Sequence, residues 1–211
     1  MKAERKELLL TLALCLSPIL AGILLYPRLP GQIPVHFNFS GDADGYAAKP
    51  FAVFGLPLLC AVLQAVLSLS LRADPKRANM SRFLLHLSLW ITPFISVLCS
   101  AMMLATALGC NANVGTVIPS FIGLLFVVIG NYLPKTKQSY TMGIKLPWTL
   151  NSEENWNRTH RLAGFLWVLC GAAFFLFSIL RLLNIYLFFA LIAVMVLVPT
   201  VYSYLLYRRG T

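Results

Sequence analysis

The sequence has few charged residues. They make up 11% of its 211 residues, whereas about 25% is usual in globular domains. Acidic residues are the scarcer kind, with 7 Asp and Glu against 17 Lys and Arg. Hydrophobic residues make up 59% of the chain, and a soluble domain of this length cannot bury so much apolar surface and still present a polar exterior. The composition therefore excludes a disordered chain and a typical soluble enzyme, and it indicates a protein whose main solvent is lipid.

The sequence also lacks the cysteine patterns of a disulfide scaffold or a zinc site. Its 5 cysteines are spread along the chain, with no CxxC pair and no Cys/His cluster. We interpret them as small hydrophobic side chains in apolar surroundings. We predict neither a metal nor another cofactor.

Long uncharged stretches dominate what remains. Six stretches of 19 to 26 residues contain no Asp, Glu, Lys or Arg, namely 8–26, 51–71, 83–108, 114–133, 162–180 and 185–207. A helix of about 20 residues crosses the hydrocarbon layer of a membrane, and lipid offers no partner to an unpaired backbone amide. We therefore predict an all-α membrane protein, in which residues 1–211 form a single domain, a bundle of six transmembrane helices.

The basic residues orient this bundle. Fourteen of them lie before the first span, after the second, after the fourth or after the sixth, and only Arg28, Lys49 and Arg181 lie on the other side. By the positive-inside rule, both termini and the loop 134–161 are cytoplasmic, and the loop 27–50 is outside. We interpret the net charge of +10 as topology plus contact with anionic membrane lipids, without direct binding of nucleic acid.

The spans themselves carry few signals of chemistry. Because no span contains a charged residue, proton-coupled transport is disfavoured. We expect Gln64 and Asn131 to form hydrogen bonds between helices, and Gly164 and Gly171 to mark a close helix contact. Only a few residues around Asn184 separate the last two spans. We therefore predict that the last two helices form a tight antiparallel hairpin. Five spans contain an internal proline, which tends to kink a helix: Pro18, Pro57, Pro93, Pro119 and Pro199.

The outer loop 27–50 is rich in proline and glycine, which predicts turns rather than helix. Asp44-Gly45 is a turn signal, and alternation of Val35, Phe37 and Phe39 predicts a short strand whose other face carries His36, Asn38 and Ser40. A metal site is disfavoured, because His36 and two nearby aspartates lack the further ligands of a zinc or calcium site. The candidate binding residues are His36, Asn38, Gly41, Asp44, Gly45 and Tyr46.

The cytoplasmic loop 134–161 contains a second group of candidates. Asn151 and Glu154 resemble a capping box, which predicts a helix that begins there and continues into the fifth span. On this helix Trp156, His160, Ala163 and Trp167 share one face. The tryptophans fit either an interfacial aromatic belt with Trp148 and Trp156 at the lipid headgroups or an added binding surface. The candidate residues are Gly143, Ile144, Lys145, Pro147, Trp148, Thr149, Trp156, His160 and Arg161.

An enzyme is the weakest of the function classes that the residues leave open. His160 is the best candidate for a catalytic base, but no nucleophile or metal-binding set accompanies it. We therefore predict that the protein is not an enzyme. A small-molecule or lipid transporter, or a flippase, is the alternative that the proline-containing helices favour.

At these two loops the chain resembles a known family. The outer loop contains IPVHFNFSGDADGYAAKP, which resembles a bacterial membrane domain of unknown function. The inner segment contains GNYLPK and then MGIKLPWTLNSEENWNRTHRLAG, which resembles the SdpI family. The chain departs from the family at Lys145, where arginine is frequent, and near Ser139, where asparagine is frequent. Together with the six spans, the resemblance covers nearly the whole chain.

The resemblance to the SdpI family implies a function that composition and spacing do not. Family members are multi-pass immunity proteins of the bacterial cell membrane, which protect the cell against a secreted membrane-active toxin peptide. Some of them also signal by holding a small cytosolic transcriptional repressor at the membrane. The implied partners of this chain are thus membrane lipids, a toxin peptide and such a repressor.

Overall fold

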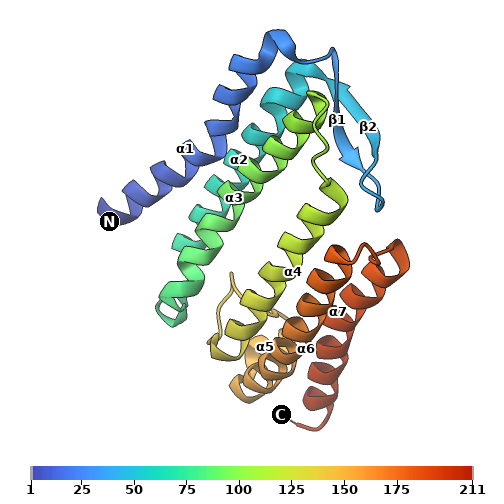
Figure 1. Cartoon of the computed structure of the whole chain (residues 1–211). Helices are drawn as coiled ribbons and strands as arrows, with labels where there is room; N and C mark the ends of the chain where they lie inside the picture. The colour runs from blue at the N-terminus through green and yellow to red at the C-terminus, as the bar shows by residue number, and fades with distance from the viewer. Residues whose placement is uncertain (1, 211) are drawn as a thin grey trace. The chain divides into compact units, whose positions relative to one another are not determined.

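A computed structural model of the chain describes residues 2–210, and helices dominate it (Figure 1). Its described part contains six helices long and apolar enough to cross a membrane: Lys6–Arg28, Phe51–Ala73, Arg82–Ala107, Val114–Lys135, Glu153–Ile179 and Ile185–Arg208. These agree with the predicted spans, so the all-α, multi-pass membrane architecture is confirmed. The cytoplasmic location of the termini and the single domain stay predictions.

The elements follow one another as long helices joined by short pieces, with one β-hairpin after the first helix. In chain order they are α1 (Lys2–Leu25), the 3-10 helix η1 (Tyr26–Arg28), β1 (Gln32–Phe37), β2 (Ala43–Ala48), the π-helix η2 (Phe51–Gly55), α2 (Leu56–Ala73), η3 (Arg77–Asn79), α3 (Arg82–Ala107), α4 (Val114–Tyr132), η4 (Leu133–Lys135), α5 (Pro147–Asn151), α6 (Glu153–Ile179) and α7 (Ile185–Arg208). All five prolines predicted inside spans lie within α-helices. Pro57 is the second residue of α2, which follows the π-helical turn, and the other four lie further inside their helices.

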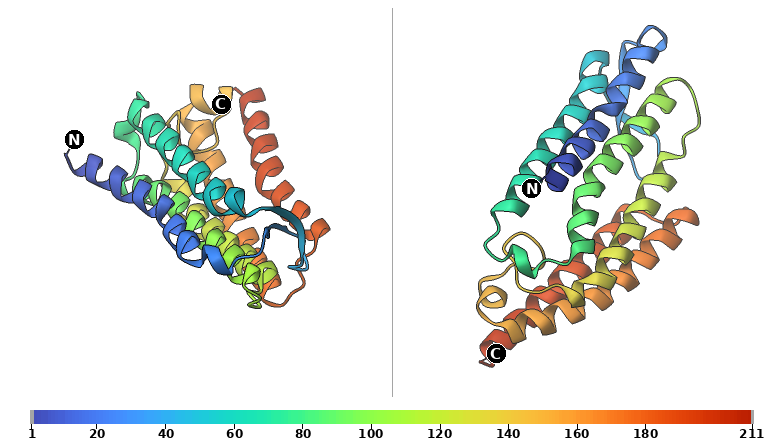
Figure 2. Two further views of the ribbon diagram at one scale, coloured as in Figure 1. Left: turned by 90° about the horizontal axis from the view of Figure 1, so that it is seen from above. Right: turned by 90° about the vertical axis from the view of Figure 1, so that its left-hand side faces the viewer.

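Backbone contacts divide the chain into two compact units, Met1–Arg72 with Leu85–Gly115, and Ala73–Leu84 with Thr116–Thr211. In the first unit α1, α2 and α3 run side by side (Figures 1 and 2). The buried Gln64 amide donates to Thr11 Oγ1 on α1 (3.0 Å) and to the Leu89 carbonyl on α3 (2.9 Å), and this confirms its predicted interhelical role. Asn131, in the other unit, is exposed instead and has no such partner among the described residues.

An apolar cluster lies where the hairpin joins the helix ends of the first unit. It consists of Leu29, Ile33, Ala52, Val53, Met103 and Leu104. The Lys49 ammonium donates to the backbone carbonyl oxygen of Tyr26 (3.0 Å) and lies 4.7 Å from the centre of the Tyr26 aromatic ring. Both ends of the hairpin are therefore attached to the helices, so its strands are held in place although they form only a two-stranded sheet.

In the second unit α4 packs closely on α6 through two pairs of glycines. A Cβ atom on Gly123 would lie 2.8 Å from the Gly171 carbonyl oxygen, and one on Gly130 would lie 3.0 Å from the Gly164 carbonyl oxygen. The reverse substitutions meet the same backbones, so no side chain fits at any of the four positions. This confirms the predicted close contact at Gly164 and Gly171, and small residues are what membrane helices use for it.

The last two helices form the predicted antiparallel hairpin, in which Asn184 Oδ1 caps α7 by accepting from the Leu187 N–H (3.0 Å). A buried polar cluster joins α6 and α7 near their other ends. The Asn155 amide donates to the Ser203 carbonyl (3.0 Å), and its oxygen accepts from the hydroxyls of Ser203 (2.9 Å) and Thr159 (3.1 Å). Each group is paired within the pair of helices, as a low-dielectric environment requires.

Candidate functional site

The outer hairpin is the first candidate region. Strands β1 and β2 are antiparallel, with Gln32 opposite Ala48 and His36 opposite Gly45. The turn is centred on Asn38, whose side-chain oxygen accepts from the N–H groups of Ser40 (3.0 Å) and Asp42 (3.0 Å). Gly41 completes it with a φ of +90°, which glycine adopts without strain. The prediction that Asp44-Gly45 forms the turn is therefore wrong: both residues lie in β2, because Asn38 closes the turn earlier.

The predicted alternation of β1 is also wrong. The register shifts on both sides of His36, and such an irregularity breaks the two-residue period of a strand. Val35 and His36 are both exposed, and the buried residues of β1 are its neighbours Ile33 and Pro34. Phe39 lies beyond the strand and is 41% exposed.

His36 and Asp44 come together on the exposed surface of the hairpin. The His36 Nδ1 and Asp44 Oδ1 atoms are 2.5 Å apart. Gly45 permits this geometry, because a Cβ atom there would lie 2.8 Å from the Cβ of His36. Tyr46 on the same strand is 60% exposed. Of the predicted candidates, His36, Asp44 and Tyr46 thus present an acid–imidazole pair and an aromatic ring at the surface. Gly45 allows the pair to form, and Asn38 and Gly41 shape the turn.

The second candidate region is the loop 136–146, which is folded around Asp74. This aspartate follows directly after α2 and is only 7% exposed. One of its oxygens accepts from the N–H groups of Tyr140 (3.0 Å) and Thr141 (2.8 Å) and from the Ser139 hydroxyl (3.1 Å). Its other oxygen accepts from the Lys76 N–H (2.8 Å). A single carboxylate therefore fixes the path of a segment 65 residues away in sequence.

These hydrogen bonds also determine the charge state of Asp74. Burial by itself raises the pKa of a carboxyl group, but the hydrogen bonds from Thr141, Lys76 and Ser139 stabilise the ionised form and outweigh it. The pKa of Asp74 therefore lies below its ordinary value, and the residue is ionised at neutral pH.

Gln138 extends this network. Its side-chain oxygen accepts from the Lys76 ammonium (3.1 Å), its backbone oxygen accepts from the Asn79 amide (3.1 Å), and its own amide donates to the Thr149 carbonyl (2.9 Å). The segment after α2 and the loop 136–146 are thus held together by side chains from both.

Trp156 and His160 hold the loop to α6. The Trp156 indole N–H donates to the Thr136 carbonyl (2.6 Å), and His160 Nε2 accepts from the Ile144 N–H (2.9 Å). Because His160 Nδ1 donates to the Trp156 carbonyl (2.8 Å), both imidazole nitrogens are used and one tautomer is selected. The two rings stack at a centroid distance of 4.0 Å and are fully buried.

Gly143 fits against these rings because it has no side chain. It has a φ of +100°, and a Cβ atom would lie 2.6 Å from His160 Nε2 and 2.7 Å from the Trp156 ring. Trp156, His160 and Ala163 lie on one buried face of α6 as predicted. The interpretation of Trp156 as an interfacial anchor is wrong, since its ring is a core side chain of the folded loop.

The start of α6 differs by one residue from the prediction. Ser152, not Asn151, caps α6, because its hydroxyl accepts from the Asn155 N–H (3.1 Å). Asn151 instead ends the short helix α5, which begins at Pro147. The buried Thr149 hydroxyl holds the entry to α5, since it accepts from the Leu146 N–H (2.9 Å) and donates to the Ile144 carbonyl (2.8 Å). The cap by Ser152 separates α6 from α5, a short helix that was not predicted from the sequence.

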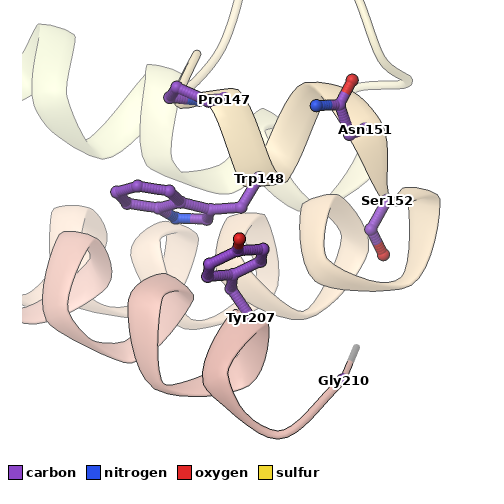
Figure 3. Close-up of a pocket in the computed structure, with 6 residues that line it drawn as sticks. All are labelled: Pro147, Trp148, Asn151, Ser152, Tyr207 and Gly210. Carbon is purple, nitrogen blue, oxygen red and sulfur yellow. The ribbon is translucent and has the colours of Figure 1, made fainter.

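Trp148 lies on α5 among tyrosines of α7. Its ring stacks on Tyr207 (5.8 Å between centroids) and meets Tyr204 edge-on (5.5 Å). Beside it is a cavity of about 550 Å³ lined by Pro147, Trp148, Asn151, Ser152, Tyr207 and Gly210 (Figure 3). The Trp148 indole nitrogen is buried and makes no hydrogen bond with the described residues. Two of the predicted loop candidates, Pro147 and Trp148, line this cavity.

The two basic candidates lie on the outside of the loop region. The Lys145 ammonium donates to the Thr141 carbonyl (3.1 Å), and its side chain is exposed. Arg161 is exposed on α6. The structure thus brings Gly143, Ile144, Thr149, Trp156 and His160 together in one network, and it places Lys145 and Arg161 at the surface.

Sequence reasoning missed the side chains that organise this network, above all Asp74 and Gln138. One signal was available for Asp74: it is an acidic residue in a short loop that is otherwise basic, next to the end of a span. No three or more His, Cys, Asp or Glu residues of the described chain are grouped as a metal site would require.

Comparison with known proteins finds two family models that match the chain over separate stretches. The SdpI/YfhL protein family model matches residues 135–203, and the model of a domain of unknown function, DUF1648, matches residues 13–61. The chain is 24% identical over 209 residues to the protein named "Immunity protein SdpI" of Bacillus subtilis (strain 168), with 97% of each chain covered. No solved structure matches the chain. The resemblance to the SdpI family that the two loops indicate is thereby confirmed.

Proposed function

We propose that this SdpI-like membrane protein is an immunity protein, not an enzyme, and that it protects a bacterium against a secreted membrane-active toxin peptide. The observation that carries the proposal is the end-to-end similarity to the immunity protein, which covers 97% of both chains. The use of both His160 nitrogens in structural hydrogen bonds is consistent with a protein that performs no acid–base catalysis. The membrane would be the bacterial inner membrane, with both termini in the cytoplasm.

In this proposal the outer hairpin makes the contact with the toxin. It is the structured part of the predicted outer face, and it presents His36, Asp44 and Tyr46 on its surface. The hairpin is attached to the helices through Lys49 and its apolar base. Because the hairpin is already held in place, less conformational entropy is lost when it binds a toxin peptide.

The folded loop would serve a second part of the function, which is signalling on the cytoplasmic side of the membrane. We propose that the surface around Trp148 and Tyr207 receives a small cytosolic transcriptional repressor. Support comes from the cavity of about 550 Å³ beside Trp148 and from the aromatic rings that line it, since aromatic side chains are enriched where proteins bind one another. The network around Asp74 would keep this surface in one conformation.

The experiment is a survival assay in a sensitive bacterium that expresses the chain. Cells are challenged with a panel of secreted membrane-active peptides, and survival is measured together with membrane potential. We expect higher survival and a preserved potential for at least one peptide. An unrelated six-helix membrane protein expressed at the same level is the control.

A transporter or flippase would give a different result in the same cells. It would change the uptake or efflux of a small solute or the sidedness of a lipid, and it would leave tolerance to every peptide unchanged. That result would refute the immunity proposal.

A further inference from the structure

A groove between α6 and α7 is lined by basic, aromatic and aliphatic side chains, and the proposed immunity function gives it no role. Its volume is about 500 Å³, and it is lined by Arg158, Arg161, Leu162, Phe165 and Tyr202. The first four residues come from α6 and Tyr202 comes from α7, so the groove is a feature of one packed helix pair within one unit.

The α6 residues form a single stripe with a polar and an apolar end. Their positions follow the spacing i, i+3, i+4 and i+7, which places them on one face of a helix. The uncharged span begins at residue 162. The two arginines therefore lie at the membrane boundary, and Leu162 and Phe165 lie within the lipid-facing length. Phe165 is 63% exposed and Leu169, one turn further on, is 51% exposed.

The charges of the groove are available to a ligand. Arg161 is exposed and, among the residues the structure describes, has neither a hydrogen bond nor an ion pair. Arg158 pairs with Glu154 (2.8 Å), but both side chains are more than half exposed. An exposed ion pair of this kind at i, i+4 is weak, so Glu154 competes poorly with a phosphate that accepts two hydrogen bonds from the Arg158 guanidinium. Glu154 lies one turn further from the span, on the side away from Phe165.

We propose that this groove binds one anionic phospholipid. The guanidinium groups of Arg158 and Arg161 hold the phosphate, and the Tyr202 hydroxyl donates a further hydrogen bond to it. The acyl chains lie along Leu162, Phe165 and Leu169. A planar guanidinium matches the geometry of a phosphate, and basic pockets between membrane helices at this depth are suited to anionic headgroups. The lipid binds across α6 and α7 and stabilises the pair.

The test uses the full chain purified in a non-ionic detergent. Its thermal unfolding is followed while short-chain phosphatidylglycerol, phosphatidylcholine of the same chain length, or inorganic phosphate is added. We expect phosphatidylglycerol to raise the melting temperature in a saturable way, and the other two to have little effect. Arg161→Gln should weaken the apparent affinity for phosphatidylglycerol about fivefold, and the double variant with Arg158→Gln should weaken it by more than tenfold.

Controls separate this site from general charge attraction. Arg209→Gln removes an exposed positive charge at the end of α7, outside the groove, and should keep the parental affinity. Where the arginine variants purify poorly, Tyr202→Phe removes only a hydroxyl and should still weaken binding severalfold. Equal stabilisation by inorganic phosphate would overturn the lipid assignment. Parental affinity in the double variant or in Tyr202→Phe, or equal losses in Arg209→Gln, would overturn the site.

Discussion

The substitution Asp74→Ala is expected to unfold the loop 136–146 and leave the six spans in place. In the structure the Asp74 carboxylate accepts from three backbone N–H groups, those of Lys76, Tyr140 and Thr141, and from the Ser139 hydroxyl. Alanine removes all of these acceptors at once. Because Asp74 is only 7% exposed, water does not reach every donor without movement of the loop.

The magnitude follows from the donors that lose their acceptor. An unpaired buried donor costs about 1–3 kcal/mol, and loop movement that admits water lowers this cost for some of the donors. We expect the substitution to lower the free energy of unfolding by about 3 kcal/mol, within the range found when one partner of a buried charged network is removed. Asp74→Asn keeps one acceptor oxygen and should cost less.

The effect of Asp74 depends on pH in a defined direction. Its pKa in the folded protein lies below its ordinary value, because the hydrogen bonds outweigh the burial that would raise it. The unfolded chain therefore takes up the proton first as the pH falls. The stabilisation is fully present above the unfolded pKa of about 4, and it is lost as the pH falls through the folded pKa. The difference between parent and Asp74→Ala should thus be largest at neutral pH and shrink in acid.

Trypsin provides the local measurement for this prediction, since Lys137 and Lys145 both lie in the affected segment. We expect faster cleavage at these two lysines in Asp74→Ala, together with a lower melting temperature in detergent. Asp42→Ala, which removes an exposed carboxylate from the outer hairpin, is the matched control and should behave like the parent. Parental cleavage and melting in Asp74→Ala would refute the role assigned to this network.

Three further predictions concern other parts of the molecule. Gly171→Ile should lower the melting temperature by several degrees, since a Cβ there would lie 2.8 Å from the Gly123 carbonyl oxygen, whereas Gly31→Ala, with no neighbouring atom within 4 Å, should not. His36→Ala should reduce survival in the toxin assay without reducing the amount of protein in the membrane on an immunoblot; a parallel loss of both would assign it to hairpin folding. Trp148→Phe should keep the parental melting temperature and Trp148→Ala should lower it, because ring stacking rather than an N–H bond holds this side chain; equal melting of both would contradict this.

The spans could be predicted from sequence because the signal is local and repeated over about 20 residues. The glycine contact was predictable for a similar reason: Gly164 and Gly171 lie seven residues apart on one helix face. Their partners, Gly123 and Gly130, have the same spacing on α4. Sequence alone did not pair the two helices, because small residues indicate that a helix packs closely and do not specify its neighbour.

The hairpin shows a competition between local signals. Asp44-Gly45 is a good turn pair, but Asn38 offers its side-chain oxygen to two backbone N–H groups, and Gly41 accepts a positive φ. The earlier turn places Gly45 opposite His36, where the absence of a side chain allows the close His36–Asp44 contact. The sequence pattern identified only Asp44-Gly45 as the turn, and the strand pairing that the structure shows places the turn earlier.

The folded loop was the least predictable region, because its organising contacts join a side chain to backbone groups far away in sequence. Asp74 binds N–H groups of residues 140 and 141, and backbone groups carry no sequence signal. The same holds for His160 with Ile144 and for Trp156 with Thr136. For Trp156 and His160 the sequence identified the side chain as unusual and misjudged its target, whereas Asp74 was missed altogether. An unusual polar residue beside an apolar span is therefore better tested first as a ligand of its own backbone, and only what remains unpaired, such as Arg161, as a contact for something outside the chain.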